Sequence, residues 1–326
     1  VKPFIGKCRD VQGDATVTMI EPLSTEGVIL SSALLPRYSD IDTYHMAASE
    51  IDPGIRRVIA VGGKLDKIAC LDNFCWPDPV QSEKTPDGEY KLAQLVRANE
   101  ALADYTKAFL VPCISGKDSM KNDSTRGGRK ISIPPSLLFS MISKMDDIRK
   151  SVTPDAKQAG DLVYVIGRTL PELGGSEYFA MLGALGNQVP KVDAERAKAI
   201  YRAVSAATDA ELVQSLTTPA LGGLGVAFAR VAMAGRLGLE IDLDAIPAEG
   251  CSDVETLFSE SNSRFVATVR PSDRAAFEEK LKGIPFACVG TVTEQPELTF
   301  RSKAGGEKHI ALEALLNAYK GTLDQI

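Results

Sequence analysis

The segment VPCISGKDSM (111–120) combines residue types that can hold a phosphate-containing ligand. An apolar run leads to Gly116, which permits close approach of the backbone to a ligand, and the positively charged Lys117 follows it. The P-loop pattern is not met, because it needs a glycine where this chain has Val111 and Ser or Thr where it has Asp118. The segment therefore predicts a phosphate-binding loop of another kind. A tight solvent-exposed turn after a strand is the alternative.

Two other segments carry groups suited to a nucleotide. CLDNFCWPDP (70–79) contains Asp72, whose carboxylate can accept hydrogen bonds from an adenine amino group or from ribose hydroxyls. A proline-rich surface loop is the alternative there. Gly222 and Gly223 open a helical pattern, and the free N–H groups at a helix N-terminus attract anions. For this pair the alternative is that the glycines only allow close packing of the helix against a sheet.

Histidine and cysteine usage restricts the possible chemistry. With 2 histidines, His45 and His309, a general base or a metal site has to use carboxylates, lysine or one of these two. Both are expected to be ordinary surface or partly buried residues, so no catalytic residue and no metal ligand are assigned. The 6 cysteines include no C-x-x-C pair, which argues against zinc and against a disulfide framework. Cys70 and Cys113 lie in apolar runs and are predicted to be small core residues.

Composition excludes several classes of function. The net charge is −6 and no basic run is interleaved with aromatic residues, so no nucleic-acid surface is expected. No apolar stretch approaches the length of a membrane span, and no signal peptide opens the chain. We therefore expect a cytoplasmic protein with no membrane partner. The chain begins Val-Lys-Pro without methionine, which suggests a piece of something longer.

The pattern of apolar residues predicts a mixed α/β (α+β) protein of two domains. In the first half we expect a buried strand over 109–115 that leads to the polar motif, and further strands over 15–23, 27–35, 67–74 and 131–145. Helices are expected over 42–62 and 89–109, the first of them with a turn or kink near Pro53. Leu92, Leu95, Val96, Leu102 and Tyr105 fall on one stripe of the second helix. A polar, turn-rich stretch at 149–161 predicts a boundary between domains 1–152 and 153–326. The second half reads as strands over 162–167, 237–243, 264–269 and 286–292, and helices over 193–206, 222–235, 272–281 and from about 311.

The order and spacing of four segments resemble one family. CLDNFCWPDP (70–79), VPCISGKDSM (111–120), the glycine-opened helix at 222–243 and LFSESNSRF (257–265) are similar to the C-terminal half of formylglycinamidine ribonucleotide synthetase, PurL. The resemblance implies a PurM-like two-domain unit: a small α/β domain whose sheet pairs with a partner copy, followed by a larger α/β domain. It also implies an amidoligase of purine biosynthesis that uses ATP, Mg2+ and ammonia from glutamine.

The resemblance assigns roles to residues of the first half. Asp72, Gly116 and Lys117 correspond to ATP-binding positions, and Asp118 and Ser119 to positions that contact the ribonucleotide substrate. Lys117 departs from the family, because many relatives carry a magnesium-binding asparagine there and a protonated lysine cannot ligate a metal.

In the second half the resemblance implies a degenerate internal site. The family has an acid where this chain has Leu221 and another where it has Ser24, so Mg2+ loses two of its preferred oxygen ligands. SESNSR (259–264) resembles the substrate-contacting segment of the active copy; a polar turn is the alternative. The predicted members of this degenerate site are Ser24, Leu221, Gly222, Gly223, Glu260, Ser261 and Asn262.

The family's catalytic histidine belongs to the N-terminal copy, and neither His45 nor His309 lies in that motif. The resemblance therefore implies three partners: an N-terminal PurL copy, a glutaminase subunit or domain, and the small PurS subunit. An isolated chain is expected to be inactive and to form a homodimer. Two alternatives stay open, a complete PurM-like synthetase acting as a homodimer and a non-catalytic scaffold half that completes another domain's site.

Overall fold

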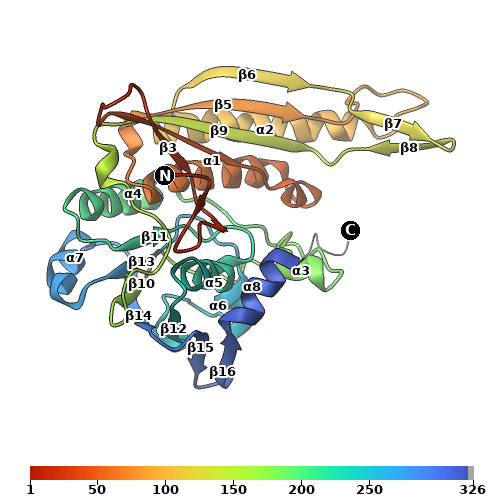
Figure 1. Ribbon diagram of the computed structural model, residues 1–326. Helices are drawn as coiled ribbons and strands as arrows, with labels where there is room; N and C mark the ends of the chain where they lie inside the picture. Colours follow the sequence, from red (N-terminus) through yellow and green to blue (C-terminus); the bar gives the residue numbers. More distant parts are fainter. Residues whose placement is uncertain (322–326) are drawn as a thin grey trace.

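The computed structural model describes residues 1–321, which form two large β-sheets with helices packed against them (Figure 1). The first sheet has the strand order β3-β4-β9-β5-β6. Its strands are β3 (Thr16–Met19), β4 (Gly27–Ala33), β9 (Ser136–Met145), β5 (Ile68–Cys75) and β6 (Cys113–Ser119). Neighbouring strands are antiparallel except β5 and β6, which run parallel. The sheet therefore ends in a parallel edge strand that carries the GKDS residues.

One face of the first sheet is covered by helices and the other is not. Helices α1 (Thr43–Ala60) and α2 (Gly88–Phe109) lie on the same side of the sheet (Figure 1). Because side chains alternate along a strand, Ile29 and Phe139 are buried on the helix side, while Leu30 and Ile142 on the other side are 51% and 39% exposed. We call this second side the open face. Its apolar members are Val28, Leu30, Ala69, Leu71, Leu138 and Ile142.

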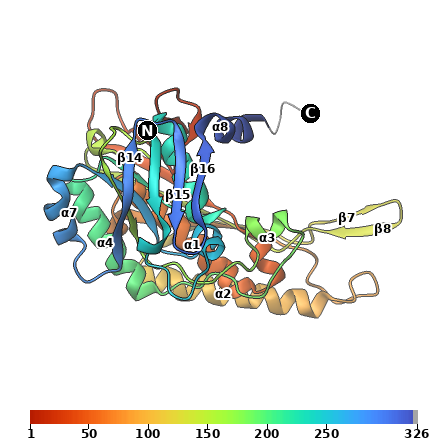
Figure 2. The same cartoon turned by 90° about the horizontal axis from the view of Figure 1, so that it is seen from below.

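The second sheet has seven strands in the order β11-β13-β10-β14-β12-β15-β16. They are β11 (Ser215–Thr217), β13 (Phe265–Val269), β10 (Leu162–Ile166), β14 (Phe286–Thr293), β12 (Gly238–Asp242), β15 (Glu297–Ser302) and β16 (Gly306–Ala311). The helices of this half are α3 (Glu177–Met181), α4 (Ala194–Asp209), α5 (Gly223–Gly235), α6 (Asp253–Phe258), α7 (Arg274–Lys280) and α8 (Leu312–Lys320). Figure 2 shows this sheet between α4 and α7 on one side and α8 on the other.

Successive side chains of β10 point to opposite faces of the second sheet and belong to two different apolar clusters. Val163 and Val165 pack with Phe228 of α5. Tyr164 and Ile166 face the opposite way and belong to a cluster that also holds Tyr201 of α4 and the buried face of α1. This second cluster continues without a break into the first sheet, so the two halves share one hydrophobic core.

The first residues of the chain pack on the second half of the molecule. The hairpin of β1 (Phe4–Ile5) and β2 (Val11–Gln12) places Ile5 and Val11 in the cluster beneath α5. The backbone N–H of Lys7 donates to the Ala234 carbonyl at 2.8 Å, and Asp10 pairs with Arg236 at 2.6 Å. The proposed boundary between residues 152 and 153 stays a prediction.

Several sequence expectations need correction. The strand expected over 109–115 begins only at Cys113 and is not buried: β6 is an exposed edge strand that contains the GKDS residues themselves. Cys113 is exposed, so only Cys70 of the two cysteines is a core residue. Helix α1 continues through Pro53 as one helix. On α2 the predicted stripe is only partly buried, since Leu92 and Val96 are half exposed.

Seven strands were missing from the sequence expectations, namely β1, β2, β7 (Asp123–Arg126), β8 (Arg129–Ser132), β11, β15 and β16. The second sheet is extended by β15 and β16, and β7 and β8 form a hairpin that projects from the molecule (Figure 1). Short 3-10 helices occur at Pro36–Asp40, Leu65–Lys67, Ile148–Lys150, Leu243–Ala245 and Pro271–Asp273. Within residues 1–321, no helix combines the length and the hydropathy that crossing a bilayer requires.

Candidate functional site

The predicted ligand-binding residues of the first half come together on the paired strands β5 and β6. Asp72 lies directly opposite Gly116 in the parallel register, and Cys75 lies opposite Ser119. The sequence predicts a loop at the GKDS residues, but Gly116 and Ser119 lie within a strand. The edge position of β6 leaves it exposed along nearly its whole length, so ligands can reach it from solvent.

Gly116 makes room for the Asp72 carboxylate. A Cβ atom at Gly116 would lie 2.8 Å from Asp72 Oδ1 and 3.1 Å from Oδ2, closer than real side chains pack. Partial burial and, to a smaller extent, the negative charge of Asp118 raise the pKa of Asp72. A carboxylate with few partners beside an open backbone is suited to accept hydrogen bonds from a ligand.

The remaining residues of the motif divide between the two faces of the sheet. Gly116 and Asp118 share the side of Asp72, whereas Lys117 and Ser119 alternate to the open face. The Lys117 ammonium donates a hydrogen bond to the Ser119 hydroxyl. The arrangement therefore presents an acidic group on one side of the edge strand and a lysine–serine pair on the other.

The predicted degenerate site is centred on Glu260, which is 2% exposed. One carboxylate oxygen accepts from the N–H of Gly222 at 2.8 Å and from the N–H of Glu177 at 2.9 Å, and the other accepts from the Tyr38 hydroxyl at 2.5 Å. Burial raises the pKa of Glu260. The chain's own carboxylate thus takes the position that an anion would occupy at the N-terminus of α5.

The glycines at this helix start serve close packing. A Cβ atom at Gly223 would lie 2.6 Å from the carbonyl oxygens of Leu257 and Ser259. Together with the Glu260 contact, this favours the packing interpretation of Gly222 and Gly223 over an anion site. Neighbouring polar side chains are also engaged: the Ser261 hydroxyl accepts from the Leu170 N–H at 3.0 Å.

A hollow of about 220 Å³ beside the start of α5 does not fit Mg2+. It is lined by Leu221 at the place of the family's acid and by Arg57 and Arg230, whose guanidinium groups cannot ligate a metal. Asp14 is present, but it pairs with Arg230 at 3.4 Å. Ser24 lies elsewhere, in the turn between β3 and β4, where its hydroxyl accepts from the Glu26 N–H at 3.0 Å.

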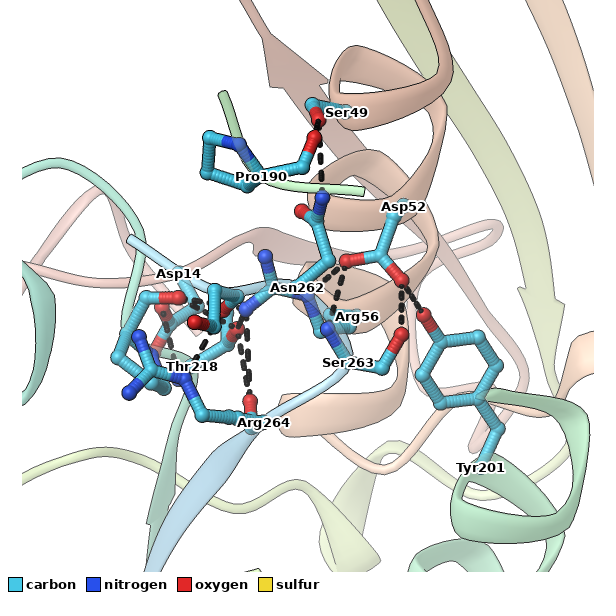
Figure 3. Close-up of polar contacts among 12 residues, drawn as sticks. Asp14, Ser49, Asp52, Arg56, Pro190, Tyr201, Thr218, Asn262, Ser263 and Arg264 are labelled. Atoms are coloured by element: carbon cyan, nitrogen blue, oxygen red, sulfur yellow. Dashed lines mark hydrogen bonds and ion pairs between the residues drawn. The ribbon is translucent and has the colours of Figure 1, made fainter. Parts of the chain in front are cut away.

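A buried polar network joins α1 to the second sheet, and sequence reasoning missed it (Figure 3). Asp52 and Arg56, one turn apart on α1, form an ion pair with side chains 0% and 1% exposed, and their Oδ2–Nε distance is 2.5 Å. The Asp52 carboxylate also accepts from the hydroxyls of Tyr201 and Ser263. Arg56 donates to Thr218 and to the Pro219 carbonyl. Two opposite charges four residues apart, on a helix whose residues from Met46 to Arg56 are all buried, were the available signal.

The SESNSR segment belongs to this structural network. Asn262 donates to the Ser49 hydroxyl at 2.8 Å (Figure 3). The buried Arg264 donates to the Ser259 carbonyl at 2.6 Å. Burial lowers the pKa of Arg264 to about 10. These side chains are occupied by contacts within the chain, which leaves few groups free for a ligand.

Neither histidine lies near the β5–β6 residues. His45 is half-buried on α1, beside a cavity of about 560 Å³ that Glu172 and Lys191 also line, and burial lowers its pKa. His309 is exposed on β16 and lies 3.1 Å from Glu297 and 3.2 Å from Glu307. Among residues 1–321 no group of three or more histidine, cysteine or acidic side chains is arranged to hold a metal ion.

Comparison with known proteins shows which proteins resemble this chain in sequence. Residues 158–303 match the family described as AIR synthase related protein, C-terminal domain. The chain is 33% identical over 285 residues to phosphoribosylformylglycinamidine synthase subunit PurL of Thermococcus sibiricus, covering 86% of this chain and 37% of that relative. It is 30% identical over 313 residues to the same subunit of Deinococcus radiodurans, covering 94% of this chain and 40% of that relative. The chain therefore spans less than half the length of these curated relatives.

Solved structures share the fold at low identity. PurL of Thermotoga maritima complexed with FGAR superimposes with a TM-score of 0.75 at 19% identity, covering 96% of this chain and 49% of that chain. Hydrogenase maturation protein HypE in complex with ATP superimposes with a TM-score of 0.63 at 12% identity, covering 95% of this chain and 90% of that chain. The same architecture thus occurs both as half of a longer chain and as nearly a whole chain.

Proposed function

We propose that this chain, which belongs to the PurM/PurL-like superfamily as a counterpart of the C-terminal half of PurL, completes the ATP- and substrate-binding site of an amidoligase. The reaction converts formylglycinamide ribonucleotide and ammonia, released from glutamine, to formylglycinamidine ribonucleotide in purine biosynthesis. In this proposal the chain supplies contacts to the ligands, and a second PurL copy supplies the catalytic histidine. The setting is the cytoplasm.

The observation that carries the proposal is the pairing of Asp72 with Gly116 on the exposed edge of the first sheet. In the proposed site Asp72 accepts hydrogen bonds from ATP and Gly116 lets the backbone approach it, while Lys117 offsets phosphate charge by reaching around the edge strand from the opposite face. Asp118 and Ser119, which also lie on opposite faces of β6, contact the ribonucleotide from the two sides of this strand. When bound, ATP supplies the phosphoryl group that activates the amide oxygen. Asp72 and Asp118 are the only acids of this motif, so Mg2+ is proposed to bind mainly through the partner copy.

The open face supports the proposed partners. A sheet face with exposed Leu30 and Ile142 is suited to pairing with another sheet, and an N-terminal PurL copy is the proposed occupant. PurL of T. maritima has been solved complexed with ATP and in a PurLQS assembly. By analogy we propose a glutaminase partner and the small PurS subunit as further members of the complex around this chain.

A second candidate is a complete PurM-like synthetase that acts as a homodimer. The observation in its favour is that HypE, of nearly the same length, shares the architecture. The leucine at position 221 and the arginine-lined hollow weigh against a self-contained magnesium site. ATP binding discriminates: a micromolar, Mg2+-dependent affinity of the isolated chain supports the homodimer, and its absence supports the half-site. A pure scaffold predicts that no variant of the β5–β6 residues changes ligand binding.

The kinetic test uses the assembled enzyme that contains this chain and an N-terminal PurL copy. Asp72→Ala is expected to raise the Michaelis constant for ATP, and Ser119→Ala that for the ribonucleotide, each by about tenfold, because hydrogen bonds to charged groups contribute about 1–3 kcal/mol. Asp66→Ala and Ser124→Ala are exposed control variants on neighbouring elements. Wild-type constants in both test variants, with unchanged melting temperatures, would refute the proposal.

A further inference from the structure

Two thiols meet where β5 and β6 begin to pair. Cys70 of β5 lies directly opposite Cys113, the first residue of β6, and their Sγ atoms are 3.1 Å apart. Cys70 is 1% exposed, whereas Cys113 is exposed to solvent. The proposed function uses neither of them, and the remaining four cysteines, Cys8, Cys75, Cys251 and Cys288, have no thiol partner among the interactions of residues 1–321.

We propose that Cys70 and Cys113 form a reversible disulfide when the protein meets a low-molecular-weight disulfide such as glutathione disulfide. Strands that pair in a sheet lie roughly 4.8 Å apart, which is within the Cα separation of about 4.4–6.8 Å that disulfides adopt. The thiols already point toward each other, so bond formation needs only a small side-chain movement. This inference stands independently of the proposed function.

Exposure assigns a different step to each cysteine. The exposed Cys113 thiolate attacks one sulfur of glutathione disulfide, which forms a mixed disulfide and releases one glutathione thiolate. The buried Cys70, after losing its proton, then attacks Sγ of Cys113, and the second glutathione leaves as a thiolate. In total two protein thiols are oxidised to one disulfide, and one glutathione disulfide is reduced to two glutathione molecules. Burial raises the pKa of both thiols, so the exchange is expected to be slow at neutral pH.

The bond would fasten the edge strand that carries the ligand-binding motif. Cys113 is the first residue of β6, three positions before Gly116, and the ladder register shifts directly after Cys70. A covalent link at this point restrains the start of an otherwise exposed strand. Backbone amide hydrogen exchange of residues 114–119 is therefore expected to slow in the oxidised protein.

Disulfide formation can be followed directly. The purified chain is incubated with glutathione disulfide, alkylated under denaturing conditions and mapped by mass spectrometry without reduction. The expected product is a peptide pair joined through Cys70 and Cys113, which dithiothreitol separates again. Exposed Cys8 should become a glutathione adduct in the same sample, which shows that the reagent is active.

Variants make the result decisive. Cys113→Ser and Cys70→Ala should each abolish the cross-link, and in Cys70→Ala a stable glutathione adduct should accumulate on Cys113. The matched control Cys75→Ser, which lies further along β5, should cross-link like wild type. Persistence of the glutathione adduct on Cys113 in the wild type, a bond from Cys113 to another cysteine, or no reaction of Cys113 while Cys8 reacts would each overturn the proposal. Unchanged circular dichroism of Cys113→Ser shows that the variant is folded.

Discussion

Glu50 on α1 shows how burial decides the behaviour of a single side chain. It is 0% exposed, and its Oε1 accepts from the Leu35 N–H at 2.8 Å. Burial raises the pKa of this carboxyl group well above 4.5. The folded protein therefore holds a proton that the unfolded chain releases, and the free energy of unfolding falls as the pH rises from the unfolded pKa toward the folded one.

Glu50→Gln should remove this dependence, because an amide keeps the shape of the protonated acid and does not ionise. At pH 8 we expect the variant to have a higher free energy of unfolding than wild type, because only the wild-type side chain gains free energy by ionising in the unfolded state. At pH 4 the two should be nearly equal. Urea denaturation at both pH values measures the difference, with the exposed Glu294→Gln as control. An equal loss of stability at both pH values would show that the carboxyl group is not held protonated.

At the residue scale the sequence identified the types of the motif residues but not their register. Asp72 and Gly116 were both assigned to ATP from the resemblance, yet their direct opposition depends on how β5 pairs with β6. The role of Glu260 as the partner of the α5 N-terminus was also unpredictable, since it depends on Tyr38 and Glu177 from distant parts of the chain. Such contacts arise only from tertiary structure.

At the scale of elements, most helices and buried strands were predictable because their apolar periodicity is strong. The helix at 194–209 begins after Asp193, whose side chain accepts from the Arg196 N–H as a cap should. β6 was misplaced because an exposed edge strand made of Ser, Gly, Lys and Asp carries no apolar alternation. For the same reason the six exposed residues of β16 gave no strand signal.

The junction of α1 with the second sheet is expected to depend on the buried ion pair of Asp52 and Arg56. Arg56→Met leaves the Asp52 carboxylate buried without its charge partner, so we expect a loss of about 3–5 kcal/mol in the free energy of unfolding. The double variant Asp52→Asn, Arg56→Met should recover much of that loss. Lys282→Ala, which removes an exposed ion pair with Glu279, should cost less than about 1 kcal/mol. Equal effects of Arg56→Met and Lys282→Ala in denaturant titrations would contradict this role.

At the scale of the whole molecule, the open face stands out because its apolar side chains are not packed into the hydrophobic core. Exposed apolar residues on one side of a sheet, with an edge strand beside them, favour association. The resemblance implies a sheet-pairing domain, which stays a prediction, and the sequence alone could not show which alternate residues of β4 and β9 stay uncovered.

The isolated chain is therefore expected to form a symmetric dimer through the open face. Leu30→Lys should raise the dimer dissociation constant by at least about tenfold, because it places a charge in the centre of the contact. Val254→Lys on α6, which is exposed but distant from this face in the fold, is the control. Light scattering over a range of concentrations distinguishes the outcomes. A wild-type chain that stays monomeric at high concentration, or equal association of both variants, would argue against the contact.

The central claim, that this chain completes a site of another PurL copy, is tested most directly by amidine formation from formylglycinamide ribonucleotide, ATP and ammonia. The rate is measured with the chain alone, with an N-terminal PurL copy alone, and with both together. We predict turnover only when both are present, because in the proposed function this chain contributes Asp72, Gly116 and Ser119 and the other copy contributes the catalytic histidine. Turnover well above background by the chain alone, or none by the mixture of two folded partners, would contradict the claim.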